Sequence, residues 1–108
     1  MSPRETGPQL SVIWWQDLPA QVVARDAARS ARAELHPRFQ RAIDRAAMGG
    51  GLAGADEYME HWRTVTRPCG PDLDAEVAAE VAALEQAHPK ERVEEIVRAV
   101  RDAREDTP

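Results

Sequence analysis

The stretch that decides the fold is Ser-Val-Ile-Trp-Trp at residues 11–15, a compact block of β-branched and aromatic residues that predicts a strand. Residues 16–19 follow as a predicted turn, because Asp17 can bond its own backbone and Pro19 is disfavoured inside a strand. Residues 21–24 then return to an extended pattern. The two extended blocks predict a β-hairpin with its tip near Asp17.

Residues 25–35 fit two structures. Their alanines and arginines favour a helix, whereas Ala31, Ala33 and Leu35 alternate with charged residues as in a half-buried strand. We predict a turn and a third strand, because two strands alone are marginal in water and a third strand covered by a helix makes a stable sheet. The helical alternative stays open at this point.

Helical periodicity begins after His36, with Pro37 in a first turn that tolerates it. The apolar positions of this first helix are Phe39, Ala42, Ile43, Ala46 and Ala47. The run Gly49-Gly50-Gly51 ends it, and a second helix is predicted after Gly54. The apolar face of the second helix would carry Ala55, Tyr58, Met59, Trp62 and Val65. The two helices should form an α-hairpin.

Two further helices are predicted in the acidic C-terminal part of the chain. Asp72 is placed to cap the third helix, and Pro89 starts the fourth. Their narrow apolar stripes consist of Leu73, Val77, Val81 and Leu84 in one helix and Val93, Ile96, Val97 and Val100 in the other. Such stripes either lie on the body of the domain or pair as a hairpin that presents an apolar seam to a partner.

These elements predict an α+β fold, in which a three-stranded antiparallel sheet, the hairpin plus one strand, is followed by about four helices. A chain of 108 residues has room for one core. We predict a disordered N-terminus over residues 1–10 and a single domain over residues 11–104. Its core is expected in residues 11–70 and an acidic helical tail in residues 71–104.

Charge and composition narrow the classes of function. The net charge is −5, and residues 69–108 hold five Lys and Arg against eleven Asp and Glu. A nucleic-acid binder is expected to show a net basic face, so we predict no nucleic-acid partner. We find neither an apolar stretch long enough for a membrane helix nor the pattern of a signal peptide, which predicts a cytoplasmic protein. Cys69 is the single cysteine and allows no internal disulfide.

The candidates for a binding surface lie mainly on the predicted hairpin. Adjacent strand residues point to opposite faces, so Trp14 and Trp15 cannot both be covered by one helical layer. An exposed tryptophan would anchor another protein, whereas a terminal helix folded over it would make it part of the core, and the two outcomes are evenly balanced. The predicted contact surface consists of Trp14, Trp15, Asp17, Pro19, Gln21 and Trp62.

Catalytic and metal-binding groups are not predicted. Cys69 lies between two prolines and would be a reactive thiol only if a base such as His36 or His61 lowered its pKa. No such base is near it in sequence. The three histidines, which include His88, share no short metal spacing, so we predict no metal and no cofactor.

Three blocks of the chain resemble the bacterial virulence factor domain family, whose small members have no known biochemical activity. They are residues 12–22, 38–48 and 56–63, and the pattern Trp-x-Asp-x-Pro-Ala-Gln from Trp15 to Gln21 is the most distinctive. The likeness covers roughly residues 11–70. It implies a strand over residues 27–33 and attaches no reaction to the chain.

The predicted function is a non-enzymatic interaction or accessory module that presents the Trp-Trp hairpin to a protein partner. The family resemblance implies an alternative, a small subunit or accessory factor of folate or corrinoid one-carbon (methyl-transfer) enzymes. A flat apolar patch around the hairpin would favour the first reading. A concave pocket with convergent polar groups near Cys69 or Asp17 would favour the second.

Overall fold

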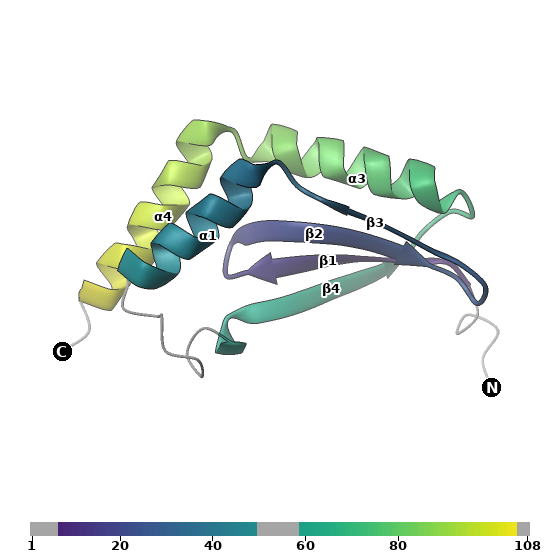
Figure 1. Ribbon diagram of the computed structural model, residues 1–108, viewed down its shortest axis with the longest axis horizontal. Coiled ribbons are helices and arrows are strands. Elements are labelled where there is room, and N and C mark those ends of the chain that lie inside the picture. The colour runs from purple at the N-terminus through teal and green to yellow at the C-terminus, as the bar shows by residue number, and fades with distance from the viewer. Residues whose placement is uncertain (1–6, 50–58, 106–108) are drawn as a thin grey trace.

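A computed structural model of the chain describes residues 7–49 and 59–105. The strands are β1 (Gln9–Trp15), β2 (Leu18–Arg25), β3 (Ser30–Glu34) and β4 (Trp62–Pro68), and the helices are α1 (Pro37–Gly49), α3 (Leu73–Ala87) and α4 (Lys90–Glu105). The strands form one antiparallel sheet in the order β3-β2-β1-β4 (Figure 1). The α+β class is confirmed, but the described residues form four strands and three helices instead of three strands and four helices.

The helix predicted after Gly54 is wrong in its C-terminal part, because Trp62 and Val65 belong to β4. This segment is rich in β-branched and aromatic residues, which fit a pleated surface better than a helix. It pairs with β1 along its whole length, residues 62–68 running opposite residues 9–15. The rest of the predicted second helix, and with it the α-hairpin, lies mostly outside the described residues. Ala55 and Tyr58 lie outside the described residues.

The β1–β2 hairpin is present, but its turn is shorter than predicted. Only Gln16 and Asp17 separate the two strands, and Gln16 has the positive φ, 53°, that two-residue hairpin turns favour. The prediction that Pro19 lies in the turn is wrong, since Pro19 lies in β2 opposite Trp14. The register slips by one residue next to it, which makes Ala20 a β-bulge, and bulges are positions where strands accommodate proline.

The strand predicted to begin at residue 11 starts two residues earlier. Gln9 and Leu10 belong to β1, and Leu10 is almost fully buried, so these two residues are not part of a disordered N-terminus. Leu10 pairs with Ala24 on β2 and with Arg67 on β4. Both β2 and β4 thus hold the first residues of β1 in place.

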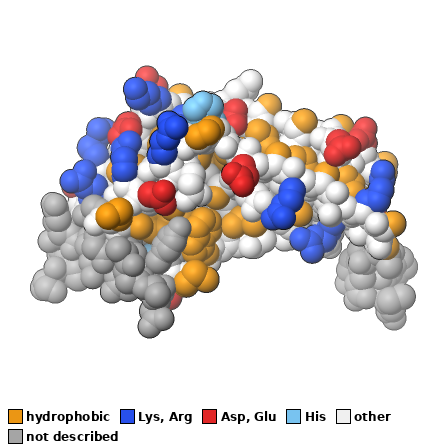
Figure 2. Space-filling model, in the orientation of Figure 1, with side chains coloured by type: hydrophobic (Ala, Val, Ile, Leu, Met, Phe, Trp, Pro, Cys, Tyr) orange, Lys and Arg blue, Asp and Glu red, His pale blue; other side chains and the backbone are white. Residues whose placement is uncertain are grey.

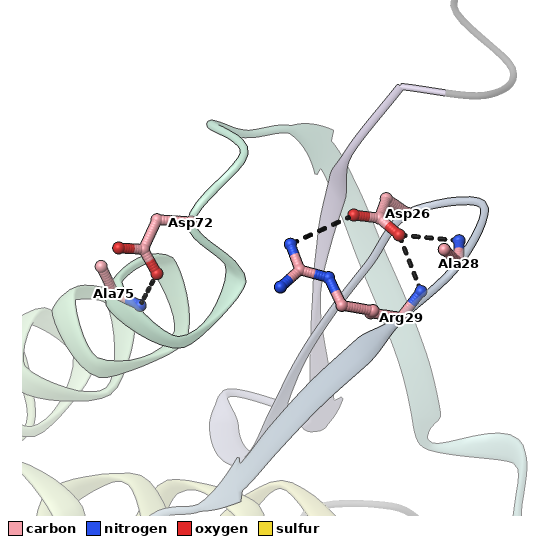
Figure 3. A network of polar contacts seen from close by, with 5 residues as sticks. All are labelled: Asp26, Ala28, Arg29, Asp72 and Ala75. Carbon is pink, nitrogen blue, oxygen red and sulfur yellow. Dashed lines mark hydrogen bonds and ion pairs between the residues drawn. The ribbon is translucent and has the colours of Figure 1, made fainter.

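The third strand is confirmed as β3, and a tight turn precedes it. The Asp26 carboxylate accepts hydrogen bonds from the backbone N–H groups of Ala28 and Arg29 at 2.8 and 2.7 Å (Figure 3). These bonds, helped by the Arg29 guanidinium, lower the pKa of the Asp26 carboxyl from its ordinary value. The antiparallel pairing of residues 30–34 with residues 21–25 decides between the two structures considered for residues 25–35 in favour of the strand.

The three helices bring the predicted apolar stripes into one core. Asp72 is the N-cap of α3, and its carboxylate accepts a hydrogen bond from the Ala75 N–H at 3.1 Å (Figure 3). The buried helical residues are Phe39, Ala42, Ile43, Ala46, Ala47, Leu73, Val77, Leu84, Val93, Ile96, Val97 and Val100. Val81 is partly buried against them. The stripes of α3 and α4 lie on the body of the domain and form no free seam.

The helices are not spread evenly over the sheet. The long axis of α3 follows β2 and β3, whereas α1 packs against α4 near the hairpin end of the strands (Figure 1). We call the face of the sheet toward α3 the inner face and the opposite one the outer face. None of the helices in the described residues is long and apolar enough to cross a membrane.

The start of α1 and the end of α3 hold each other through reciprocal hydrogen bonds, which we call the helix clasp. The backbone N–H of His36 donates to the Glu85 carboxylate at 3.0 Å. In return, Nη2 of Arg38 donates to the backbone oxygens of Glu85 and His88, each at 3.2 Å. The N-terminus of a helix leaves backbone N–H groups without intrahelical partners, and the C-terminus leaves backbone C=O groups. The helix clasp supplies partners for groups of both types.

Candidate functional site

The predicted contact residues are divided between the core and both faces of the sheet. Trp15 and Pro19 are fully buried. The Trp15 ring meets His61 edge to face, with ring centroids 5.6 Å apart. Asp17 is exposed at the hairpin tip. A partner could reach Trp15 and Pro19 only if the fold opened, so these two residues are part of the core.

Trp14 lies on the inner face and is half-buried. Its ring meets the His88 ring edge to face at a centroid distance of 5.9 Å, and the Arg63 guanidinium lies 5.1 Å from its centroid. Phe39 on α1 contacts the same His88 ring at 6.1 Å. Trp14 thus packs β1 against the junction between α3 and α4.

Gln21 and Trp62, the remaining predicted contact residues, come together on the outer face. A row of side chains crosses the whole sheet here, because Ile13 pairs with Gln21 on one side and with Thr64 on the other. Gln21 pairs in turn with Glu34. Residues 37–41, at the start of α1, stand beside this row and close one side of it.

The row and the start of α1 enclose a hollow of about 440 Å³, which we call the outer hollow. Its chemically distinctive lining residues are Ile13, Gln21, Glu34, Gln40, Arg41 and Trp62. This volume lies in the range of sites that hold a small ligand or an anchoring side chain. On the side of the molecule shown in Figure 2, hydrophobic side chains are visible below α1, with charged side chains around them.

The outer hollow combines apolar surface with unpaired charges. Ile13 and Trp62 supply the apolar surface. The ion pairs of the described residues join Arg29 to Asp26, Arg45 to Glu94 and Arg67 to Glu80. Glu34 and Arg41 take part in none of these pairs. The outer hollow can therefore bind an apolar group that carries, or lies next to, opposite charges.

Gln21 has a fixed orientation at the floor of the outer hollow. In the amide orientation that satisfies both of its polar atoms, its oxygen accepts from Nε and Nη2 of Arg32 at 2.9 and 2.7 Å. Arg32 is the neighbour of Gln21 across the β2–β3 pair, two residues before Glu34. These two bonds from Arg32 fix the amide plane of Gln21.

Sequence reasoning missed four of the six distinctive lining residues: Ile13, Glu34, Gln40 and Arg41. Once residues 30–34 are a strand, their period of two places Glu34 on the face opposite Ala33. That signal was present in the sequence. The pairing of Glu34 with Gln21 was not, because it depends on the turn at Asp26 and on the bulge at Ala20.

Cys69 follows β4 and is half-buried. Burial raises the pKa of its thiol, the Glu76 carboxylate raises it further, and the Arg67 guanidinium opposes both effects. A thiol with a raised pKa carries little thiolate at neutral pH, so Cys69 lacks the activation of a nucleophilic cysteine. Neither Cys69 nor Asp17 lines the outer hollow.

The three histidines have separate structural environments. His61 packs on Trp15, His88 lies between Trp14 and Phe39, and Nδ1 of His36 accepts a hydrogen bond from the Arg38 N–H at 3.0 Å. Within residues 7–49 and 59–105, no group of three or more His, Cys, Asp or Glu side chains is placed to hold a metal ion.

Comparison with known proteins gives one match. A family model described as "Virulence factor" matches residues 13–97, which run from the middle of β1 into α4. The match includes every lining residue of the outer hollow and extends well beyond the three blocks that first suggested the likeness. No curated protein and no solved structure matches the chain significantly.

Proposed function

Because this chain belongs to the virulence factor family, we propose that it is a non-enzymatic interaction or accessory module that docks a partner protein at the outer hollow. The observation that supports this proposal is that Glu34 and Arg41, which form no ion pair within residues 7–49 and 59–105, lie beside the half-buried indole of Trp62. The partner places an apolar side chain against Ile13 and Trp62 and a basic residue beside Glu34.

The proposal moves the contact surface away from most of the hairpin. Of the six predicted contact residues, Gln21 and Trp62 remain in it, and Glu34 and Arg41 join them. Protein interfaces concentrate their binding energy on a few side chains that fill a pocket, while charges at the rim set orientation and association rate. The outer hollow provides both kinds of group within one patch.

The test uses charge reversals at the rim. We expect a tagged copy of the protein to retain a defined partner when purified from its host, and Glu34→Lys and Arg41→Glu to reduce that retention. The matched controls are Glu95→Lys and Arg92→Glu, which reverse exposed charges on α4. The partner is then purified and titrated against all five proteins. We expect both rim variants to bind at least roughly tenfold more weakly, about 1.4 kcal/mol, and both controls to bind like the wild type.

The same titration defines the outcome that ends the proposal. Equal binding by wild type, Glu34→Lys and Arg41→Glu would mean that the partner docks elsewhere. Loss of binding in the α4 controls as well would point to nonspecific charge attraction, which is also incompatible with a specific contact at the outer hollow. Circular dichroism and thermal unfolding of each variant establish that it is folded before its affinity is compared.

A further inference from the structure

The β4 strand forms an edge of the sheet and is exposed along most of its length. It has β1 on one side, and residues 63–68 are all exposed. The other edge, β3, is two residues shorter and lies along α3. An edge strand carries a row of backbone groups that can pair with another chain, so β4 is the accessible edge among the described strands.

The hydrogen-bond pattern shows which β4 backbone groups face outward. The Gln16 N–H donates to the His61 carbonyl at 3.0 Å, and the Cys69 N–H donates to the Pro8 carbonyl at 3.1 Å. In an antiparallel ladder such directly bonded pairs alternate with non-bonded pairs. Since the register is constant between them, residues 63, 65 and 67 bond to β1.

The intervening residues Thr64 and Thr66 therefore point their backbone N–H and C=O groups away from β1. A short side-chain contact supports this assignment. The side-chain oxygens of Ser11 and Thr66 are 2.8 Å apart, as expected for a pair of residues at a closely spaced, non-bonded position. Pro68 has no N–H and marks the end of the usable edge. The edge thus offers two complete donor and acceptor pairs.

The side chains of β4 set the chemistry of an incoming strand. Arg63, Val65 and Arg67 share one face, and Val65 is 49% exposed. On the other face Thr64 and Thr66 present hydroxyl-bearing, β-branched side chains. Opposite charges facing one another across two strands stabilise their pairing, and like charges weaken it. A complementary strand carries an apolar residue opposite Val65 and acidic residues two positions before and after it.

We propose that the free edge of β4 binds an extended segment of a partner protein in antiparallel orientation, with an apolar residue flanked by acidic residues at alternate positions. This inference goes beyond the docking at the outer hollow and does not depend on it. The Thr64 and Thr66 backbone groups supply the affinity. Arg63 and Arg67 supply the preference for acid, Arg67 by exchanging its exposed ion pair with Glu80 for one with the incoming strand.

A second copy of the chain fits this edge poorly. In the symmetric pairing that uses all of β4, Val65 lies opposite its own equivalent, and Arg63 lies opposite Arg67 twice. These pairs fall at the closely spaced, non-bonded positions, where like charges repel most strongly. A strand with glutamate opposite Arg63 and opposite Arg67 removes this repulsion, so we choose a segment of a different protein as the partner.

The probe is a blocked peptide, Thr-Glu-Thr-Val-Thr-Glu-Thr, titrated into the isotope-labelled protein and followed by amide NMR. We expect saturable shifts concentrated on residues 62–68 and slower amide exchange at Thr64 and Thr66. The peptide with lysine for both glutamates should bind at least tenfold more weakly. Methylating the backbone nitrogens of its third and fifth residues, which would face β4, should abolish binding. Methylating that of the central valine, which would face solvent, should leave it intact.

A protein variant tests the same geometry from the other side. Thr64→Pro removes an N–H that points away from β1 and keeps the hydrogen bonds to β1, so this variant should remain folded but no longer bind the peptide. Glu34→Lys should bind the peptide as the wild type does. Absence of shifts on β4 at millimolar peptide, or equal binding by the two methylated peptides, would overturn the inference. A dimer that dissociates in Thr64→Pro would overturn the choice of occupant. Failure at the outer hollow would leave these results unchanged.

Discussion

The two edges of the sheet are protected in different ways. Along β3, the helix α3 covers the inner face, where Ala31 and Ala33 lie near Val77 and Val81. Along β4, the described helices leave residues 63–68 exposed. This strand carries Arg63 and Arg67 and ends at Pro68. Charge and proline are among the means by which proteins keep an open edge from aggregating.

The difference shows that the β3 edge is held by packing against α3, whereas the β4 edge is held by its pairing with β1 and by one exposed ion pair between Arg67 and Glu80 of α3. Mutations that disturb α3 should loosen β3 and leave β4 paired, because α3 contacts β2 and β3 most extensively. Mutations on the exposed side of β4 should change binding more than stability. Paired substitutions, one near each edge, test this division.

An aspartate introduced on α3 and one introduced on β4 should differ most in their effect on stability. Val77 on α3 is 5% exposed, and Val77→Asp buries an unpaired carboxylate, which should destabilise the protein by roughly 3–5 kcal/mol. The matched change Val65→Asp lies on an exposed strand between Arg63 and Arg67 and should alter stability by no more than about 0.5 kcal/mol. Urea unfolding of the two variants measures both. Equal losses would contradict the division.

The helix clasp should give the next largest effect. Arg38→Ala leaves the Glu85 and His88 backbone oxygens without their donor, and we expect a loss of roughly 1–3 kcal/mol in the free energy of unfolding. The control is Arg41→Ala, one turn further along α1 and in none of the ion pairs, which should change it by less than about 0.5 kcal/mol. Hydrogen exchange should show earlier loss of protection in β3 than in β4.

The N-cap of α3 should have a smaller effect in the same direction. Asp72→Ala removes the acceptor for the Ala75 N–H and should destabilise the protein by about 1 kcal/mol. Asp74→Ala, in the first turn of the same helix, removes a charge favourable to the helix dipole but no cap, and should cost only about 0.3–1 kcal/mol at low salt. Adding salt should shrink the Asp74 effect and leave most of the Asp72 effect. An identical salt response would contradict the capping role.

The smallest expected effect is a pH dependence at the turn before β3. The pKa of Asp26 lies below its ordinary value of 3.8 in the folded chain, so its ionised form adds stability above that value. This stability is lost as the pH falls through the folded pKa. The difference in unfolding free energy between wild type and Asp26→Asn should therefore shrink as the pH falls from above 3.8 through the lowered pKa of the folded chain. A difference that grows on acidification would reverse the assigned sign.

Much of the fold follows from local patterns in the sequence. The stripe from Phe39 to Ala47 predicts α1, the cap at Asp72 predicts the start of α3, and residues 11–15 predict the first strand. The stripe has the period of 3.6 of a helix with one buried face, the cap marks a helix start, and the strand is marked by its β-branched and aromatic composition. These elements could be located without knowing their partners.

The strand β4 could not be located in this way. Its residues 63–68 are exposed on both faces, so no alternation of apolar and polar residues marks it as a strand. Its spacing of Met59, Trp62 and Val65 also matches a helix, and this local match led to the wrong prediction. What fixes the strand is its pairing with β1, about fifty residues earlier in the chain.

The candidate site shows the same limit. Gln21 and Trp62 were identified as contact residues, but only the pairing of β2 with β3 and of β1 with β4 brings them to one hollow. Trp15 was a candidate because Trp14 and Trp15 point to opposite faces of a strand, and Pro19 because it was expected in the hairpin turn. Both are core residues, because their side chains are fully buried in the strands on either side of the exposed tip at Asp17.

The position of β1 has a consequence for the order of events during synthesis. β1 is central in the finished sheet, but its second neighbour, β4, is translated only after β2, β3 and α1. On a ribosome, β1 and β2 can pair early as a local hairpin. Until residue 68 has emerged, the most apolar strand of the protein is itself an unpaired edge, which makes this interval the time of greatest aggregation risk.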